Sequence, residues 1–272
     1  MLKEYNLDGK VAIVSGAGRG LGRAIALALA EAGADIVVAS RTSSELEETA
    51  VGVRQEGRKC LNIPADITDI EQVKKVVESA ISTFERVDIL VNNAGMTSYK
   101  TLVPMPGLEK LRIAKVLPNL NTPISDEEWN MIWNTNVKGG LNCTRLVVPF
   151  MIEQGKGKII NIVSTAAVKY TALQGIYPAT KAAVVAITRN LANDLARFNI
   201  NVNAIGPGGV MTKMLESVYS DEDAANKYLR MVPLRRFGKP REVGLLAVYL
   251  AADASDYMTG QTLYLDGGLT AS

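Results

Sequence analysis

Three polar side chains in the middle of the chain have the types and the spacing needed to handle a proton at a carbonyl group. Tyr177 and Lys181 are four residues apart, so a helix that begins near Pro178 would present them on one face. Ser164 follows the apolar run Ile159–Val163, which is typical of a buried parallel strand. The sequence therefore predicts a strand end that holds Ser164 and a helix start that holds the other two.

A carbonyl-directed role for these side chains has a specific chemical basis. A free phenol has a pKa near ~10, which is too high for efficient acid or base work at neutral pH. A cation one helical turn away stabilises the phenolate, so Lys181 is expected to lower the pKa of Tyr177. The Ser164 hydroxyl is able to donate to a carbonyl oxygen that gains negative charge. The alternative is a packed tyrosine beside a solvated lysine, and only the rest of the chain distinguishes the two.

Composition excludes several other kinds of protein. The chain has 272 residues, 47% hydrophobic, with a net charge of +2, so nothing attracts it strongly to nucleic acid or membranes. It has no histidine, which excludes Ser-His-Asp hydrolysis and His-ligated metals. Cys60 and Cys143 are expected to be buried reduced thiols, not metal ligands. No apolar run reaches the ~18–20 residues of a membrane span, and no signal peptide is recognised. We expect one cytoplasmic domain over residues 1–272.

A glycine-rich turn follows the first predicted strand, residues 10–15. Gly16, Gly20 and Gly22 have the spacing G-x-x-x-G-x-G, and a strong helix follows them. Such a turn lets the backbone approach a pyrophosphate, and the helix start offers free N–H groups and a positive dipole. A flexible loop without a ligand is the alternative. The flanking strand and helix favour dinucleotide binding.

The end of the second predicted strand, residues 35–39, bears on the choice of dinucleotide. Folds that prefer NAD usually carry Asp or Glu there, to bind the ribose 2′-hydroxyl. This chain has Ser40 and Arg41 instead, and Arg41 could join Arg19 of the glycine turn in clamping a 2′-phosphate. We therefore expect NADP(H) to be favoured, with NAD(H) possible. Two solvated surface arginines are the alternative.

Strand-like and helical segments alternate along the chain. Further strands are predicted at 59–64, 88–91, 159–163, 201–205 and 262–265, and helices at 43–55, 68–84, 125–153, 177–198 and 241–251. This alternation predicts an α/β fold: a Rossmann-like, doubly wound, mostly seven-stranded parallel sheet with helices on both faces. Residues 97–123 break the rhythm with several prolines and a possible short helix at 108–117, so they form an insertion.

Taken in order, these segments resemble the short-chain dehydrogenase/reductase family, in its single-domain form with a Tyr-x-x-x-Lys site. Each motif is weak alone, but their order and the thirteen-residue step from Ser164 to Tyr177 fit the family over nearly the whole chain outside 97–123. Position 15 is Ser where Thr is usual, which keeps a hydroxyl. The residues that carry the resemblance are Ser15, Gly16, Gly20, Gly22, Asn92, Asn93, Ala94, Gly95, Asn136, Ser164, Tyr177, Lys181, Pro207, Gly208 and Thr212.

The resemblance implies a role for each of these positions. Tyr177 is the expected general acid for carbonyl reduction, and the base for the reverse reaction. Lys181 would lower its pKa and bind the nicotinamide ribose, Ser164 would hold the substrate oxygen, and Asn136 would position a water that relays protons to Lys181. No metal is expected. The implied cofactor-binding residues are Gly16, Arg19, Gly20, Leu21, Gly22, Ser40, Arg41, Asp66, Ile67, Asn93, Ala94, Gly95, Tyr177, Lys181, Pro207, Gly208 and Thr212.

The expected function is that of an NAD(P)(H)-dependent oxidoreductase, NADPH-preferring, which interconverts a ketone and a secondary alcohol on a small or medium hydroxylated or cyclic substrate. A 3-oxoacyl thioester reductase is an alternative, and it would need a basic docking patch, for which Arg145, Lys156 and Lys158 are candidates. A non-catalytic dinucleotide-sensing protein is an alternative of another class. An enoyl reductase expects a different tyrosine–lysine spacing.

The family resemblance also implies how the protein assembles. Members are usually dimers or tetramers, so a homo-oligomer is expected, with no nucleic-acid or membrane partner. The predicted helices 126–153 and 177–198 would supply one interface. The apolar region 257–269 would supply a second.

Overall fold

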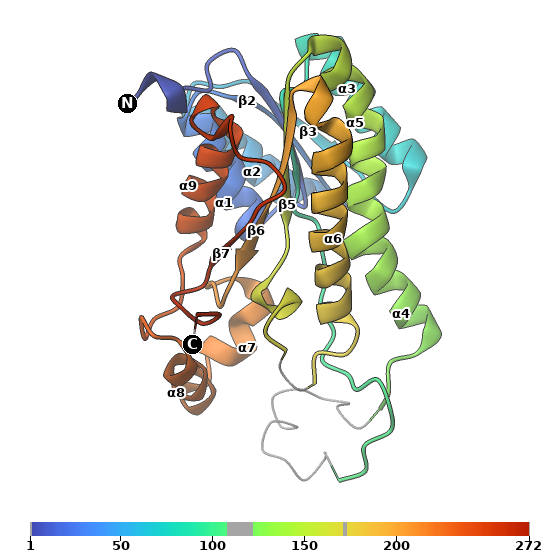
Figure 1. Ribbon diagram of the computed structural model, residues 1–272, viewed down its shortest axis with the longest axis vertical. Coiled ribbons are helices and arrows are strands. Elements are labelled where there is room, and N and C mark those ends of the chain that lie inside the picture. Colours follow the sequence, from blue (N-terminus) through green and yellow to red (C-terminus); the bar gives the residue numbers. More distant parts are fainter. Residues whose placement is uncertain (1, 108–121, 171–172, 272) are drawn as a thin grey trace.

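The computed structural model describes residues 2–107, 122–170 and 173–271 (Figure 1). Its centre is one seven-stranded parallel sheet with the strand order β3-β2-β1-β4-β5-β6-β7. This order confirms the Rossmann-like prediction. The possible helix at 108–117 lies outside the described residues. The strands are β1 (Val11–Ser15), β2 (Asp35–Ser40), β3 (Cys60–Pro64), β4 (Ile89–Asn92), β5 (Gly157–Ile162), β6 (Ile200–Pro207) and β7 (Thr262–Leu265).

Helices cover both faces of this sheet. In Figure 1, α1, α2 and α9 lie on one side, and α3, α5 and α6 lie on the other. The short helices α7 and α8 lie at the end of the molecule where α6 begins. The helices are α1 (Gly20–Glu31), α2 (Ser43–Gln55), α3 (Ile70–Phe84), α4 (Asp126–Trp133), α5 (Gly140–Gln154), α6 (Tyr177–Leu195), α7 (Glu216–Tyr219), α8 (Glu222–Met231) and α9 (Pro240–Ala251).

Burial on both faces explains why the strands read as continuous apolar runs. Along β1, Ala12 and Val14 belong to the hydrophobic cluster under α1 and α9, whereas Val11 and Ile13 belong to the cluster under α3 and α5. Successive side chains of a strand point to opposite faces, so a sheet covered on both sides needs apolar residues at every position.

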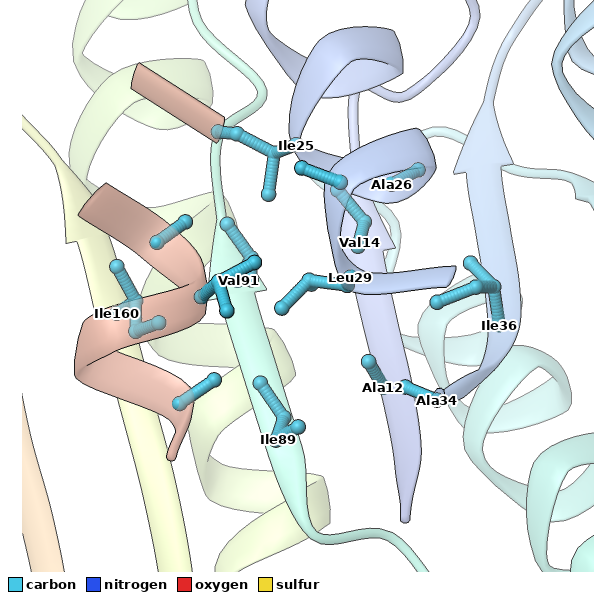
Figure 2. Close-up of a cluster of buried hydrophobic side chains, with 14 of the residues drawn as sticks. Ala12, Val14, Ile25, Ala26, Leu29, Ala34, Ile36, Ile89, Val91 and Ile160 are labelled. Atoms are coloured by element: carbon cyan, nitrogen blue, oxygen red, sulfur yellow. The ribbon is translucent and has the colours of Figure 1, made fainter. Parts of the chain in front are cut away.

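The cluster under α1 and α9 is drawn in Figure 2. Ile25 and Leu29 of α1 lie near Val14 and Val91, and Ile160 belongs to the same cluster on the side of α9; the last three come from three adjacent strands. All five side chains are at most 1% exposed. Burying one such side chain stabilises a fold by about 1.5–3 kcal/mol relative to leaving it in water. This packing fixes the strands whose carboxyl ends build the site described below.

One predicted helix differs from the structure. The segment 125–153 was expected to be continuous, but a π-helical turn, η4 (Asn134–Gly139), separates α4 from α5. Ser125 does cap the start of α4, in a reciprocal capping box with Glu128. A π turn inside a helix is frequently found at functional sites. Here it contains Asn136, whose side chain is held by contacts outside the helix.

Candidate active site

A cavity of about 470 Å³ lies at the carboxyl edge of the sheet. It spans the ends of β1 and β4, where the order of strands reverses, which is the usual ligand position in open α/β sheets. Its volume is within the range of small-molecule sites. The predicted site residues that line it are Gly16, Arg19, Gly20, Leu21, Ser40, Arg41, Asp66, Ile67, Asn93, Ala94, Gly95, Tyr177, Lys181 and Thr212.

Three predicted cofactor residues lie behind the lining instead. A Cβ on Gly22 would lie 2.3 Å from the Gly16 carbonyl oxygen, so Gly22 lets α1 pack closely under the glycine turn. Pro207 ends β6, and the Gly208 N–H donates to the Leu265 carbonyl at 3.0 Å. These three residues are not among those that line the cavity, and their contact with a cofactor stays a prediction. The sequence pattern alone does not distinguish residues that line the cavity from residues that pack beneath it, because small residues are needed in both positions.

The turn after β1 is tied to the end of β4 by one hydroxyl. Ser15 Oγ accepts hydrogen bonds from the backbone N–H groups of Asn93 and Ala94, at 3.1 and 3.2 Å. The Asn93 amide donates back to the carbonyl oxygens of Ser15 and Gly16, at 2.9 and 3.1 Å. Gly16 has φ +64°, and a Cβ there would lie 2.7 Å from Ala94 Cα. The polar residues after β1 and β4 therefore form one rigid wall of the cavity.

Ser164, Tyr177 and Lys181 meet where β5 ends and α6 begins. Ser164 Oγ accepts a hydrogen bond from the Ala166 N–H at 3.1 Å, which caps the 3-10 turn η5 (Thr165–Ala167). Tyr177 starts α6, and Pro178 occupies the first turn. The Lys181 ammonium lies 5.7 Å from the centre of the Tyr177 ring and donates to the Ile162 carbonyl at 2.9 Å.

Burial controls the protonation of this group. It raises the pKa of Tyr177, and the hydrogen bond with the Ser164 side chain opposes this shift without cancelling it. Burial also lowers the pKa of Lys181 to about 8. The net shift of the Tyr177 pKa is therefore upward, opposite to the direction expected from the sequence, and desolvation of the phenol is its largest cause. The phenol is protonated at neutral pH, which suits a proton donor.

Asn136 lies outside the cavity lining, in the π turn. Its Oδ1 accepts from the Met96 N–H at 2.8 Å, and its Nδ2 donates to the Met96 carbonyl at 2.9 Å and to Thr180 Oγ1 at 3.0 Å. Both amide hydrogens are therefore used in joining the segment after Gly95 to α6. The predicted role in positioning a water would have to use the second lone pair of Oδ1 or the Asn136 backbone, since both amide hydrogens are already used.

The residues expected to bind the adenosine ribose lie at the end of the cavity opposite Tyr177 and Lys181. Arg41 is exposed, and Ser40 Oγ is buried without a hydrogen-bond partner. Arg19 Nη1 lies 3.0 Å from Glu45 Oε1, a carboxylate that also lines the cavity. Asp66 Oδ1 accepts from the Thr68 N–H and hydroxyl, at 2.9 and 2.8 Å, which fixes that carboxylate.

Several lining residues are not among the predicted catalytic and cofactor-binding residues. They come from loops, from α2, from the end of β5, and from the short turns η4 and η7 (Lys213–Leu215). The described part of the 97–123 insertion also reaches the site: the Lys100 carbonyl lies 2.9 Å from where a Cβ on Gly175 would be, and Tyr99 adds to the raised pKa of Tyr177. The lining residues in question are Gly18, Thr42, Glu45, Ala65, Met96, Thr97, Thr135, Ile162, Val163, Lys213 and Met214.

The two cysteines are free thiols with different surroundings. Cys143 is buried, and burial raises its pKa to about 12. Cys60 is only partly buried, which corrects the expectation for that residue, and its pKa is raised to about 11 by desolvation. Among the residues that the structure describes, no group of three or more acidic or cysteine side chains could hold a metal ion. Nor is any described helix long and apolar enough to cross a membrane.

Comparisons with known proteins show which family the chain is similar to. A family model described as enoyl-(acyl carrier protein) reductase matches residues 16–270. The 2-dehydro-3-deoxy-D-gluconate 5-dehydrogenase of Dickeya dadantii is 38% identical over 272 residues, 100% of this chain and 99% of that protein. The 3-oxoacyl-[acyl-carrier-protein] reductase FabG of Thermotoga maritima is 36% identical over 263 residues, 97% of this chain and 98% of that protein.

A solved structure gives the same relationship. The crystal structure of a gluconate 5-dehydrogenase from Burkholderia cenocepacia, in complex with NADP and tartrate, matches with a TM-score of 0.87. It is 32% identical in sequence, and the match covers 100% of this chain and 99% of that one. Since the relatives match along its full length and the sheet and site have the expected order, the chain belongs to the short-chain dehydrogenase/reductase family, whose members are oxidoreductases that use NAD(P).

Proposed function

We propose that this protein is an NADPH-preferring oxidoreductase that interconverts a ketone and a secondary alcohol on a small or medium hydroxylated substrate. The observation that carries the proposal is the presence of Tyr177 and Lys181 in the same cavity as the glycine turn at Gly16 and Gly20. A protein that only sensed the dinucleotide would not need a buried phenol and a buried amine at the far end of that cavity.

The residues present fit a dinucleotide. Gly16 begins the turn after β1 and Gly20 is the first residue of α1, so the turn lacks side chains at both points and the helix start offers free backbone N–H groups to a pyrophosphate. Ser40 Oγ is a buried hydroxyl without a partner, at the end where a ribose phosphate would lie. Asp66, Asn93 and Lys181 would hold the adenine and the two riboses. When bound, the nicotinamide supplies or accepts the hydride.

The chain itself handles the proton. Tyr177 is a protonated phenol at neutral pH and donates to the carbonyl oxygen that gains charge. Ser164, hydrogen-bonded to that phenol, holds the same oxygen. Lys181 has a pKa of about 8, so it exchanges protons readily near neutral pH and is able to restore the proton of Tyr177. Lys181 is buried, and the partial burial of Ser164 and Tyr177 limits the access of competing water.

The cavity walls favour a hydroxylated substrate. Thr97, Thr212 and Lys213 supply hydroxyl and ammonium donors. The Dickeya dadantii relative is named for a gluconate derivative, and the Burkholderia cenocepacia structure holds tartrate, both hydroxylated acids. These observations support a hydroxylated ketone, or the matching alcohol, as the substrate class.

A 3-oxoacyl thioester reductase is the second candidate, because the Thermotoga maritima relative carries that name. Two of the three residues considered for a docking patch do not suit it. Lys158 is 3% exposed, and Lys156 is paired with Asp253 and Asp256, both at 2.9 Å. Both lysines flank the start of β5, at the sheet edge opposite the cavity. Arg145 alone is exposed.

The catalytic proposal is tested with Tyr177→Phe. Losing the proton donor should lower kcat by about 10²–10⁴-fold, with unchanged NADPH affinity. The readout is cofactor absorbance with hydroxylated ketones, polyols and a 3-oxoacyl thioester, alongside equilibrium cofactor binding. Full activity of the variant would overturn the assignment of Tyr177. Turnover of the thioester alone would select the second candidate.

The NADPH preference has a separate test. Arg41→Ala should weaken NADPH binding by ~1.5–3 kcal/mol, the value of a charge-assisted contact, and NADH binding much less. Dissociation constants for the two reduced cofactors measure the difference. Equal losses for both would contradict a role of Arg41 at the 2′-phosphate.

We also infer a homo-oligomer, dimer or tetramer. A groove of about 720 Å³ runs between α6 and β7, lined by small and polar residues such as Ala182, Ala186 and Arg189. These are the elements that the sequence assigned to subunit contacts. Light scattering coupled to size-exclusion chromatography would measure the mass, and a monomer at micromolar concentration would overturn the inference.

A further inference from the structure

Glu45, in the first turn of α2, places a carboxylate beside the end of β2, where the sequence has Ser40 and Arg41 and no acidic residue. It lines the cavity together with Ser40 and Arg41, and its Oε1 lies 3.0 Å from Arg19 Nη1. A Cβ on Gly18 would lie 3.0 Å from Ser40 Oγ and 3.2 Å from Glu45 Oε2. The hydroxyl and the carboxylate therefore converge on one point of the glycine turn, although they come from different elements.

This ion pair has no large role in holding the fold together. The Arg19 side chain is 59% exposed and that of Glu45 is 30% exposed, and such pairs contribute little to stability. An acid in a first turn also favours the helix dipole, but this effect does not require contact with an arginine across the cavity. The backbone is held separately, because Arg23 donates to the Gly18 carbonyl at 2.6 Å and to the Glu45 carbonyl at 3.3 Å.

We propose that Glu45 makes this protein a dual-cofactor enzyme: its carboxylate accepts a hydrogen bond from the ribose 2′-hydroxyl of NAD(H) and opposes the 2′-phosphate of NADP(H). The inference rests on the proposed function. In dinucleotide folds an acid at the end of the second strand does the first of these jobs. Here the strand ends in Ser40 and Arg41, and α2 brings the acid to the same place.

The charges near this point explain both effects. A 2′-phosphate gains from Arg41 but must draw Arg19 away from Glu45 and lie close to a carboxylate of its own sign. A 2′-hydroxyl has no charge to be repelled and donates to the carboxylate. The preference for NADPH that two arginines would produce is therefore reduced, and NADH remains a usable cofactor.

The test is Glu45→Gln, with binding of NADPH and NADH measured by nicotinamide fluorescence at equilibrium. NADPH should bind about tenfold more tightly, and NADH about fivefold or more weakly, as expected when one charged contact is lost or gained near the surface. Glu47→Gln is the matched control. It removes the same charge from the same helix, but Glu47 pairs with Arg54 at 2.8 Å and with Asn62 at 2.6 Å. Its two dissociation constants should stay unchanged.

Each other outcome overturns the inference in a recognisable way. If the Glu45→Gln variant bound both cofactors as the parent does, or differed for NADPH only, the proposed hydrogen bond from the 2′-hydroxyl to Glu45 would be wrong. The proposed function would not be affected. If Glu47→Gln changed the two dissociation constants as much as Glu45→Gln, the cause would be the loss of a negative charge anywhere on this helix, and not a contact made by Glu45. If the unmodified protein bound neither cofactor, the proposed function itself would fail. Thermal unfolding of both variants should match the parent, which separates selectivity from folding.

Discussion

Two buried lysines lie at opposite ends of strand β5. Lys158 is its second residue and is 3% exposed; its ammonium lies 2.7 Å from Asp256 Oδ1 and 3.3 Å from Ser255 Oγ. Lys181 is 5% exposed, and its ammonium donates to the carbonyl of Ile162, the last residue of the strand. One lysine meets a carboxylate, and the other meets a backbone carbonyl and the ring of a tyrosine.

The difference separates a structural cation from a chemical one. Burial lowers the pKa of both lysines, but Asp256 opposes the shift at Lys158. At Lys181 burial is the cause of the shift, and the pKa falls to about 8. A buried charge without a counter-charge costs stability, and such sites persist where the protonation change is used. We therefore expect Lys158, at the amino edge of the sheet, to contribute to stability, and Lys181, at the carboxyl edge, to contribute to the proposed chemistry.

The largest expected effect is on activity at the carboxyl edge. Lys181→Met should lower kcat by about 10²–10⁴-fold, because Tyr177 loses its proton partner. The same change should leave the free energy of unfolding equal or higher, since an uncompensated buried amine is removed. Steady-state kinetics and urea unfolding measure the two quantities. A large loss of stability would show that Lys181 is structural after all.

The pH dependence of stability sharpens the comparison. Lys181 binds its proton up to about pH 8 when folded and up to its ordinary 10.5 when unfolded, so the unfolded state holds more protons between these values. The free energy of unfolding should therefore rise with pH in this window, by roughly 3 kcal/mol relative to Lys181→Met, at about 1.4 kcal/mol per pKa unit. Urea unfolding of both proteins from pH 7 to 10.5 gives the difference. A constant difference across that range would refute the low pKa.

At the amino edge the expected loss is in stability. Lys158→Met should cost about 1–2 kcal/mol, less than for a fully buried pair because the Asp256 side chain is 48% exposed and stays hydrated. Activity per folded molecule should stay within about twofold, a change too small to reflect a lost catalytic contact. The measurements are those used for Lys181→Met. A drop in kcat as large as that of the Lys181 variant would erase the distinction between the two edges.

The smallest effect belongs to an exposed neighbour of Lys158. Lys156 contacts Asp253 and Asp256 but is 36% exposed, so Lys156→Met should change the free energy of unfolding by less than about 1 kcal/mol. High salt should reduce even this difference. If Lys156→Met lowered the free energy of unfolding as much as Lys158→Met does, the ion pairs with the aspartates, and not the burial of the lysine, would account for the stability at this edge.

Much of the fold was predictable because its signals are local. Continuous apolar runs marked the strands, and Pro178 and Pro240 marked helix starts, as the structure has them. The break at Asn134–Gly139 was not predictable. Asn136 leaves the helical pattern to bind Met96 and Thr180, and both contacts are made across the fold.

The sequence by itself determined the parts of the site that depend on spacing. Tyr177 and Lys181 share a face because they are one turn apart, and Gly16 and Gly20 form a turn because both adopt positive φ. Tertiary structure alone decided what surrounds them. Glu45 reaches Arg19 across 26 positions of the chain. The raised pKa of Tyr177 comes from burial, which no single segment encodes, because desolvation is produced by all the elements that pack around a group.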